Sequence, residues 1–208
     1  RLFGFLQPAA IPAAAHDDAG VGLVAVLQLD AFGRQNARRM ARVVMEFQRL
    51  VAERQRVAFL HHHVALGQQV RKDDERIKAS YETIPIPSPN GNGYIRGYFV
   101  RPFSQDTRAA TPTKLPAVLV IHENRGLNPH TEDVARRFAL ENFIAFAPDA
   151  LTTVGGYPDD DYKGGQLFNK IDRAKLTQDF VACAQWLKAH ALSNTKVCVT
   201  GFCFGGGV

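Results

Sequence analysis

Apolar residues along the chain form short unbroken runs separated by stretches with helical spacing. Residues 117–121 and 143–147 are continuous apolar runs, which is the pattern of strands buried on both faces of a parallel sheet. Residues 197–200 form a third such run. Before it, residues 172–191 carry apolar side chains three and four positions apart, which predicts a long amphipathic helix. Its expected buried face comprises Leu176, Phe180, Cys183, Ala184, Leu187 and Ala191.

Another helix is predicted between the first two runs. Thr131, which two acidic residues follow, is the predicted N-cap of this helix. The helix is expected to extend to about Leu140, with Val134 and Phe138 facing inward. Upstream, residues 94–100 predict a strand that follows a region of turn-forming proline and glycine. Strands and helices that alternate in this order form right-handed βαβ units, so the fold class is α/β.

The composition changes near residue 70. Residues 1–71 contain nine arginines, five acidic residues and no lysine, for a net charge of +4, whereas residues 72–208 carry only +1. We therefore expect an atypical Arg-rich segment over residues 1–70, helical or disordered, and a globular domain over residues 71–208. Residues 31–60 have helical spacing, and the three histidines at 61–63 favour a solvated stretch over a metal site.

Charge and cysteine content exclude several classes of protein. The overall charge of +5 is concentrated in the N-terminal third, so a nucleic-acid role is disfavoured. No run approaches the ~18 consecutive apolar residues of a membrane helix, and no convincing signal peptide precedes the domain. Three cysteines without a CxxC pair indicate a reducing compartment, expected to be the cytoplasm, and argue against structural zinc. We expect no metal and no cofactor.

The segment with the strongest chemical signal is KVCVTGFCFGGGV at residues 196–208. A buried strand leads into Gly201-Phe202-Cys203-Phe204-Gly205, a cysteine version of the strand–turn–helix nucleophile elbow. The glycines allow close approach of the neighbouring strand and helix, and a helix beginning near Phe204 would favour the thiolate. A phosphate-binding loop lacks its required lysine, and a glycine-rich loop with a chance cysteine is less favoured. Cys183 and Cys198 are expected in the core.

A second polar segment, residues 122–126, directly follows the first buried strand. Ligands of α/β sheets bind at the carboxyl ends of strands, and in this type of fold the loop supplies one oxyanion donor. Asn124 and Phe204 are therefore candidate backbone N–H donors, and Glu123 is expected to face Cys203. A surface salt bridge is the alternative for Glu123, and His122 or His130 as substitute base is disfavoured.

These motifs resemble the dienelactone hydrolase family. The similar stretches are YETIPIPSPNGNGYIRGYFVRP, PAVLVIHENRGLNPHTEDVARRFA, FIAFAPDALTTVGGYP and KVCVTGFCFGGGV. The resemblance implies an incomplete α/β-hydrolase sheet with flanking helices and a Cys-His-Asp triad that opens a small-molecule ester or lactone. In that resemblance, Cys203 matches the nucleophile and Glu123 matches a glutamate that contacts the resting cysteine.

The chain departs from the family in two ways. In this fold the acid and histidine follow the nucleophile, whereas the sequence ends five residues after Cys203. The alternative to an ester or lactone hydrolase is thus a truncated, non-catalytic remnant, and this chain alone is expected to be inactive, with an aggregation-prone open sheet edge. Residues 1–64 do not resemble the family, which suggests a shifted reading frame or a fusion. The possibility that these Arg-rich residues form a basic module that binds acidic partners is weakly supported. The loop at residues 155–165 is a candidate lid, and its aspartates 159–161 favour a solvated loop over a cation site.

Overall fold

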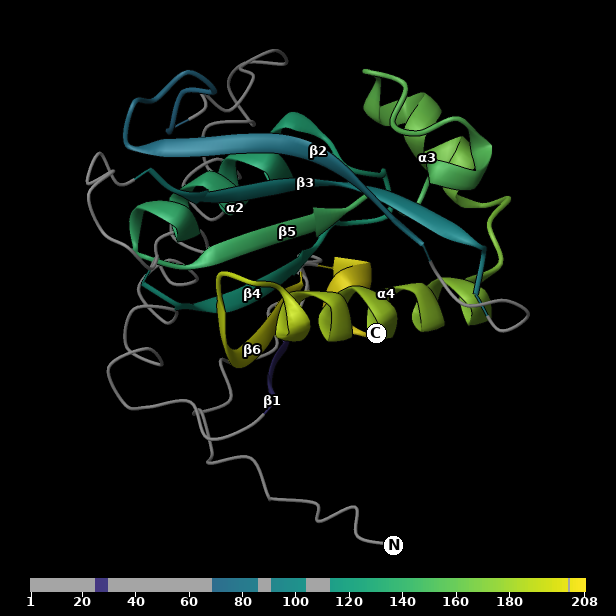
Figure 1. Cartoon of the computed structure of the whole chain (residues 1–208). Coiled ribbons are helices and arrows are strands. Elements are labelled where there is room, and N and C mark those ends of the chain that lie inside the picture. Colours follow the sequence, from purple (N-terminus) through teal and green to yellow (C-terminus); the bar gives the residue numbers. More distant parts are fainter. Residues whose placement is uncertain (1–24, 30–68, 86–90, 104–112, 202) are drawn as a thin grey trace, which may run out of the picture.

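The structure, a computed structural model, describes residues 25–29 as backbone and residues 69–85, 91–103, 113–201 and 203–208 with their side chains (Figure 1). The helix predicted over residues 31–60 and the histidines at 61–63 lie outside this part of the chain, as does Phe202.

Six strands form one mixed sheet in the order β1-β6-β4-β5-β3-β2 (Figure 1). Only β4 has parallel neighbours on both sides, β5 and β6, while the outer strands pair antiparallel. The α/β fold is therefore confirmed, and each of the four predicted strands is present. The strands are β1 (Ala25–Leu29), β2 (Ile77–Pro85), β3 (Tyr94–Pro102), β4 (Leu115–Ile121), β5 (Ile144–Pro148) and β6 (Ser193–Gly201).

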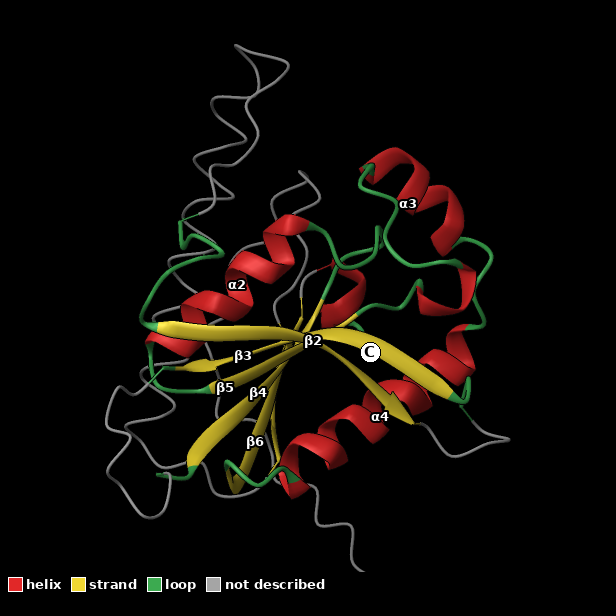
Figure 2. Cartoon of the chain, turned by 45° about the horizontal axis from the view of Figure 1, so that its top comes forward, coloured by secondary structure: helices red, strands yellow, loops and turns green. Residues whose placement is uncertain are grey.

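Helices cover both faces of the sheet. Figure 2 shows α2 on one face and α4 on the other, with α3 beyond the end of the sheet. None of the helices in the described residues is long and apolar enough to cross a membrane. The helices are α2 (Pro129–Leu140), α3 (Asp161–Phe168) and α4 (Arg173–Ala189), together with the 3-10 turns η1 (Thr152–Val154) and η2 (Cys203–Gly206).

The start of α2 differs from the sequence prediction. Asn128, not Thr131, is the N-cap, and its side-chain oxygen accepts hydrogen bonds from the backbone N–H and hydroxyl of Thr131 at 3.0 and 3.1 Å. Pro129 then occupies the first helical turn, where its missing N–H costs nothing. The end of α4 was also predicted too late, since the helix stops at Ala189 and Ala191 is exposed.

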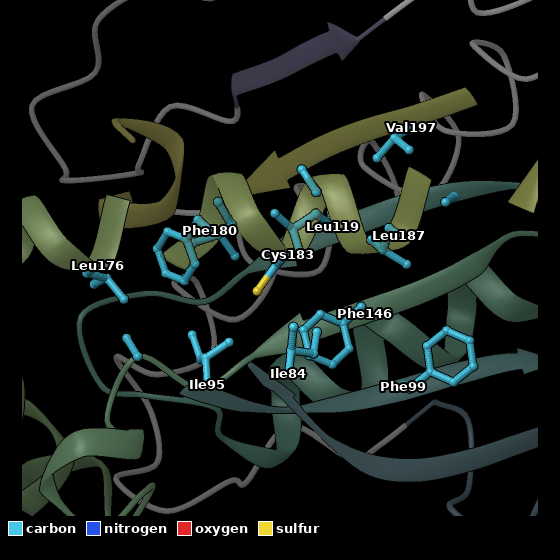
Figure 3. Close-up of a cluster of buried hydrophobic side chains, with 14 of the residues drawn as sticks. Ile84, Ile95, Phe99, Leu119, Phe146, Leu176, Phe180, Cys183, Leu187 and Val197 are labelled. Atoms are coloured by element: carbon cyan, nitrogen blue, oxygen red, sulfur yellow. The ribbon is translucent and has the colours of Figure 1, made fainter. Parts of the chain in front are cut away.

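Each face of the sheet carries its own hydrophobic core. The core under α2 contains Val134 and Phe138, as predicted, and the core under α4 contains Leu176, Phe180 and Leu187. Figure 3 shows the second core, with the Cys183 sulfur surrounded by apolar side chains. Cys198 belongs to the first core.

Both predictions for the buried cysteines are confirmed. Cys183 and Cys198 are 0% and 1% exposed, and burial raises the pKa of each thiol well above its usual range. A thiol with a raised pKa carries little thiolate at neutral pH, so these two side chains act as small apolar residues.

The edge of the sheet beside β6 is covered by β1. Ala25 pairs with Gly201 and the register continues to Leu29 with Val197, so all five β1 residues lie against the last part of β6. This strand comes from the segment expected to be helical or disordered, and it was not predicted. The expectation of an open edge beside β6 is therefore wrong.

Candidate active site

Cys203 lies at the turn that follows β6. Its φ is +53°, in the left-handed region that non-glycine residues rarely adopt, and its side chain is exposed. The following turn, η2, is a four-residue 3-10 turn, so the longer helix predicted from Phe204 is not observed. A strained backbone that presents an exposed thiol at a strand end is the geometry expected of a nucleophile elbow.

The two glycines around Cys203 are required by close backbone contacts. A Cβ atom on Gly201 would overlap the backbone of Gly205. On Gly205 it would lie 2.6 Å from the Ile121 carbonyl oxygen and 2.9 Å from that of His122. Real Cβ contacts are longer than this, so a side chain at Gly201 would force the turn apart from the end of β6, and one at Gly205 would push the turn away from β4. The sequence suggests that glycines are needed here because side chains would clash with neighbouring segments, and these contacts confirm that explanation.

The ends of β4 and β6 bring their loops to the same edge of the sheet. Ile121 pairs with Gly201 in parallel register, so Glu123 and Cys203 each lie two residues beyond a paired position. Glu123 is half-buried, and its carboxylate forms no ion pair with another described residue, which disfavours the surface salt bridge. Asn124 is exposed in the turn that follows.

Phe204, the other predicted oxyanion donor, is fixed by an aromatic contact. Its ring meets the ring of Phe168 edge-on at a centroid distance of 4.7 Å, and Phe168 also contacts the buried His122 ring. The guanidinium of Arg173 lies 6.0 Å from the Phe204 ring centroid. Residues near the start and end of the α3–α4 connection therefore pack against the turn that carries Cys203.

His122 connects two loops and has no accessible nitrogen. Its Nδ1 hydrogen-bonds the Glu123 carbonyl oxygen, and its Nε2 accepts the Ala150 backbone N–H at 3.0 Å. This arrangement places the ring proton on Nδ1, and complete burial lowers the pKa of the imidazole. His122 is thus a neutral structural residue, which agrees with the prediction that it does not replace the catalytic base. His130 lies in the first turn of α2.

Asp149 is a site residue that the sequence did not single out. Its carboxylate accepts three backbone N–H bonds, from Leu127 at 3.2 Å, Leu151 at 3.0 Å and Tyr157 at 2.8 Å. It is buried and directly follows Pro148 at the end of β5. An acid immediately after a buried strand was the available signal. Asp149 fixes the loop after β4 relative to the loop after β5.

Of the aspartates at 159–161, Asp159 is exposed, as expected of a solvated loop, whereas Asp160 and Asp161 lie at the start of α3 and have structural partners. Asp160 caps α3 by accepting the Lys163 N–H at 2.9 Å. Asp161 pairs with Arg125 at 3.2 Å and accepts the Tyr157 hydroxyl at 3.0 Å. The described residues contain no group of three or more histidine, cysteine or acidic side chains placed to hold a metal ion. Asp161 thus links α3 to the loop after β4.

Comparison with known proteins shows one consistent relationship. The dienelactone hydrolase family profile matches residues 105–208. A protein of Escherichia coli K12 provisionally named hydrolase fragment YghX is 51% identical over 113 residues, which are 54% of this chain and 90% of that protein. An E. coli K12 protein provisionally named carboxymethylenebutenolidase is 29% identical over 140 residues, 66% of this chain.

The match to the longer relatives is partial. The chain spans about half the length of the carboxymethylenebutenolidase, 48%. A crystal structure of a provisionally named dienelactone hydrolase from Klebsiella pneumoniae superposes with a TM-score of 0.49 at 28% identity, and covers 62% of this chain and 51% of that one.

Proposed function

The chain belongs to the dienelactone hydrolase family, and we propose that Cys203 is the nucleophile of a hydrolase acting on carboxylic esters or lactones. The observation that carries the proposal is the exposed Cys203 thiol at φ +53°, between two glycines that admit no side chain. The buried thiols of Cys183 and Cys198 are poor alternatives because their pKa values are raised.

The proposed chemistry is acyl transfer through a thioester. The Cys203 thiolate attacks the carbonyl carbon, a C–S bond forms, and the carbonyl π electrons move onto oxygen. The backbone N–H groups of Asn124 and Phe204 would hold this oxyanion. Collapse breaks the C–O bond, the alkoxide takes up a proton, and water then hydrolyses the thioester. Glu123, at the same edge, would influence the ionisation of the resting thiol.

The second candidate is a non-catalytic remnant, and one observation favours it. No histidine or carboxylate among the described side chains forms a hydrogen bond with the Cys203 thiol. Without a general base, both proton transfers depend on water, and such losses reduce turnover by several orders of magnitude. Under this alternative the chain would keep the nucleophile turn and acylate slowly without turning over.

Reaction with p-nitrophenyl acetate separates the two candidates. We expect one acetyl group per chain on Cys203, located by peptide mass spectrometry, with Cys183 and Cys198 unmodified as internal controls. Continued nitrophenol release after this first turnover supports the hydrolase, whereas a single turnover supports the remnant. Equal release by the wild type and Cys203→Ala would refute a nucleophilic role altogether.

The substrate and setting follow the same proposal. Small-molecule esters or lactones are the expected substrates, without nucleic acid or membrane partners. All three cysteines are free thiols, which suits the proposed reducing, cytoplasmic location. If air oxidises Cys203 in the isolated protein, so that an acyl donor no longer labels it, the result would fit a protein that needs a reducing compartment. Full acylation of Cys203 after prolonged exposure to air would count against that location.

A further inference from the structure

A cavity lies away from the Cys203 turn. It has a volume of about 440 Å³, and its walls come from β2, β3, the first turn of α2 and the loop after β5. Tyr81, Tyr94 and Tyr157 line it, and we call it the tyrosine pocket. None of Cys203, Glu123, Asn124 or Phe204 lines it. Any ligand of this pocket would thus contact none of the proposed catalytic residues.

Arg96 is a cation of the tyrosine pocket and shares its lining with Lys72 and with the acidic residues Glu132, Asp149 and Asp159. Its guanidinium carbon lies 4.7 Å from the centroid of the Tyr81 ring, and no described carboxylate pairs with it. Its backbone N–H donates to the Thr152 hydroxyl at 3.1 Å, and its carbonyl accepts the Asp149 N–H at 2.7 Å. A guanidinium stacked on a ring face keeps its in-plane N–H groups available for a bidentate carboxylate.

The Tyr81 ring beneath Arg96 is held in place. Its hydroxyl donates to the buried Glu132 carboxylate, which also pairs with Lys72 at 2.9 Å. Burial and the adjacent Glu132 raise the pKa of this phenol, so Tyr81 stays neutral. Lys72 balances the charge of Glu132 directly. Asp149 also lines the pocket, and its carboxylate accepts three backbone N–H bonds. Arg96 is therefore the lining cation that has no carboxylate partner among the described residues, although the lining as a whole carries three carboxylates against two cations.

Tyr157 is an equally restrained ring on another wall. Its backbone N–H donates to Asp149 at 2.8 Å and its hydroxyl to Asp161 at 3.0 Å. The preceding Gly155 and Gly156 have φ values of +101° and +85°, and a Cβ on Gly155 would meet nothing within 4 Å. The wall beside Tyr157 is thus bare backbone, which leaves space for a planar group against the ring.

We propose that the tyrosine pocket binds a small aromatic monocarboxylate, with its carboxylate on Arg96 and its ring among the tyrosines. Two fixed rings and a preorganised guanidinium match a planar anion, and they lose little side-chain entropy on binding. The N-terminal end of α2, where Pro129 and Glu132 line the pocket, adds a favourable dipole for a negative charge. Asp149 and Asp159 also line the pocket and oppose the anion, so they limit the affinity.

Titration of the full chain with benzoate, followed by ¹H–¹⁵N NMR, tests the proposal. We expect saturable shifts at the amides of Arg96, Gly155, Gly156 and Tyr157 with a Kd on the order of 0.1–1 mM. Benzamide, which lacks the charge, and cyclohexanecarboxylate, which lacks the planar ring, should each bind at least about tenfold more weakly. No saturable shift up to 10 mM benzoate, about ten times the upper Kd, refutes the proposal.

Charge variants give the sharper test because they act in opposite directions. Arg96→Gln should weaken benzoate binding at least about tenfold, whereas Asp159→Asn should tighten it about twofold. Arg101→Gln is the matched control, since Arg101 lies on the same strand but does not line the pocket. The spectrum of each variant verifies that it is folded.

Three outcomes would overturn the proposal even if all variants fold. One is unchanged affinity in Arg96→Gln, and another is tighter binding of benzylamine than of benzoate, which would make Asp159 the recognition group. A third is benzoate shifts confined to residues 203–206. Cys203→Ala should bind benzoate like the wild type, so failure of the proposed hydrolase function would leave this result unaffected.

Discussion

Replacing Gly205 by alanine tests whether the turn after β6 depends on close contact with β4. The added Cβ would lie 2.6, 2.8 and 2.9 Å from three atoms of Ile121 and His122. Two of these atoms are backbone carbonyl oxygens, which cannot rotate away. Relief therefore requires the whole turn to move outward by several tenths of an ångström.

The expected cost can be worked out from this overlap. Inserting a methyl group into a well-packed site costs about 1–3 kcal/mol, and the restricted unfolded chain returns about 0.4–1 kcal/mol. A net loss of about 1–2 kcal/mol follows, and it lowers the Tm of a domain of this size by roughly 3–8 °C. The same outward movement would shift Cys203, so its rate of alkylation should also change severalfold.

Thermal denaturation by circular dichroism, with iodoacetamide labelling of Cys203 in parallel, measures both effects. Gly207→Ala is the matched control, because a Cβ there lies 3.6 Å from the Phe204 carbonyl oxygen, an ordinary contact. A Tm difference within about 1 °C is roughly the scatter between neutral surface variants. If the Tm of Gly205→Ala lies within that range of the Tm of Gly207→Ala, and both variants are labelled at the same rate, then the turn does not approach β4 as closely as described.

Three further predictions follow from local geometry. Cys203→Gly should be more stable than Cys203→Ala by about 1 kcal/mol in urea unfolding, because glycine adopts φ +53° without strain; the usual order, alanine above glycine, would contradict this. The pKa of His122 is lowered by burial, so the unfolded chain takes up a proton first as pH falls below about 6.5, and stability should decline by up to about 1.4 kcal/mol per pH unit. His122→Gln should flatten that decline between pH 6.5 and 5 more than His190→Gln, and equal profiles would exclude the assignment. Finally, Leu27→Pro removes a backbone N–H donor from β1 and should increase the hydrogen-exchange rate about tenfold or more at the β6 amides that face β1. Unchanged exchange rates would show that β1 does not protect this edge of the sheet.

The parallel part of the sheet could be predicted because its strands are buried on both faces. Burial on both faces demands continuous apolar runs, and residues 117–121 and 143–147 leave no other interpretation at that length. The elbow could be predicted for a related reason. Close backbone approach excludes every side chain at Gly201 and Gly205, so the constraint is visible in the sequence itself.

Of the features that were missed, the N-cap of α2 was ambiguous locally, whereas β1 and Asp149 depend on partners distant in the sequence. The N-cap of α2 depends on whether Asn128 or Thr131 faces the first free N–H groups, and both residue types cap helices well. The strand β1 depends on an open edge more than 160 residues further along the chain, and a five-residue segment with four apolar residues does not by itself specify a strand. Asp149 has three partners in two loops, which no local pattern reports.

The polar residues that were missed also explain how the candidate site keeps its shape. Asp149 bonds amides in the loops after both β4 and β5, and His122 bonds from the first loop to Ala150 in the second. Asp161 adds a connection from α3 to Arg125. A backbone N–H that is to bind an oxyanion must be oriented before the charge forms, since reorientation during the reaction adds to the barrier. In the proposed mechanism, the buried Asp149 carboxylate and His122 imidazole would thus support Cys203 indirectly, by fixing the loop that carries Glu123 and Asn124.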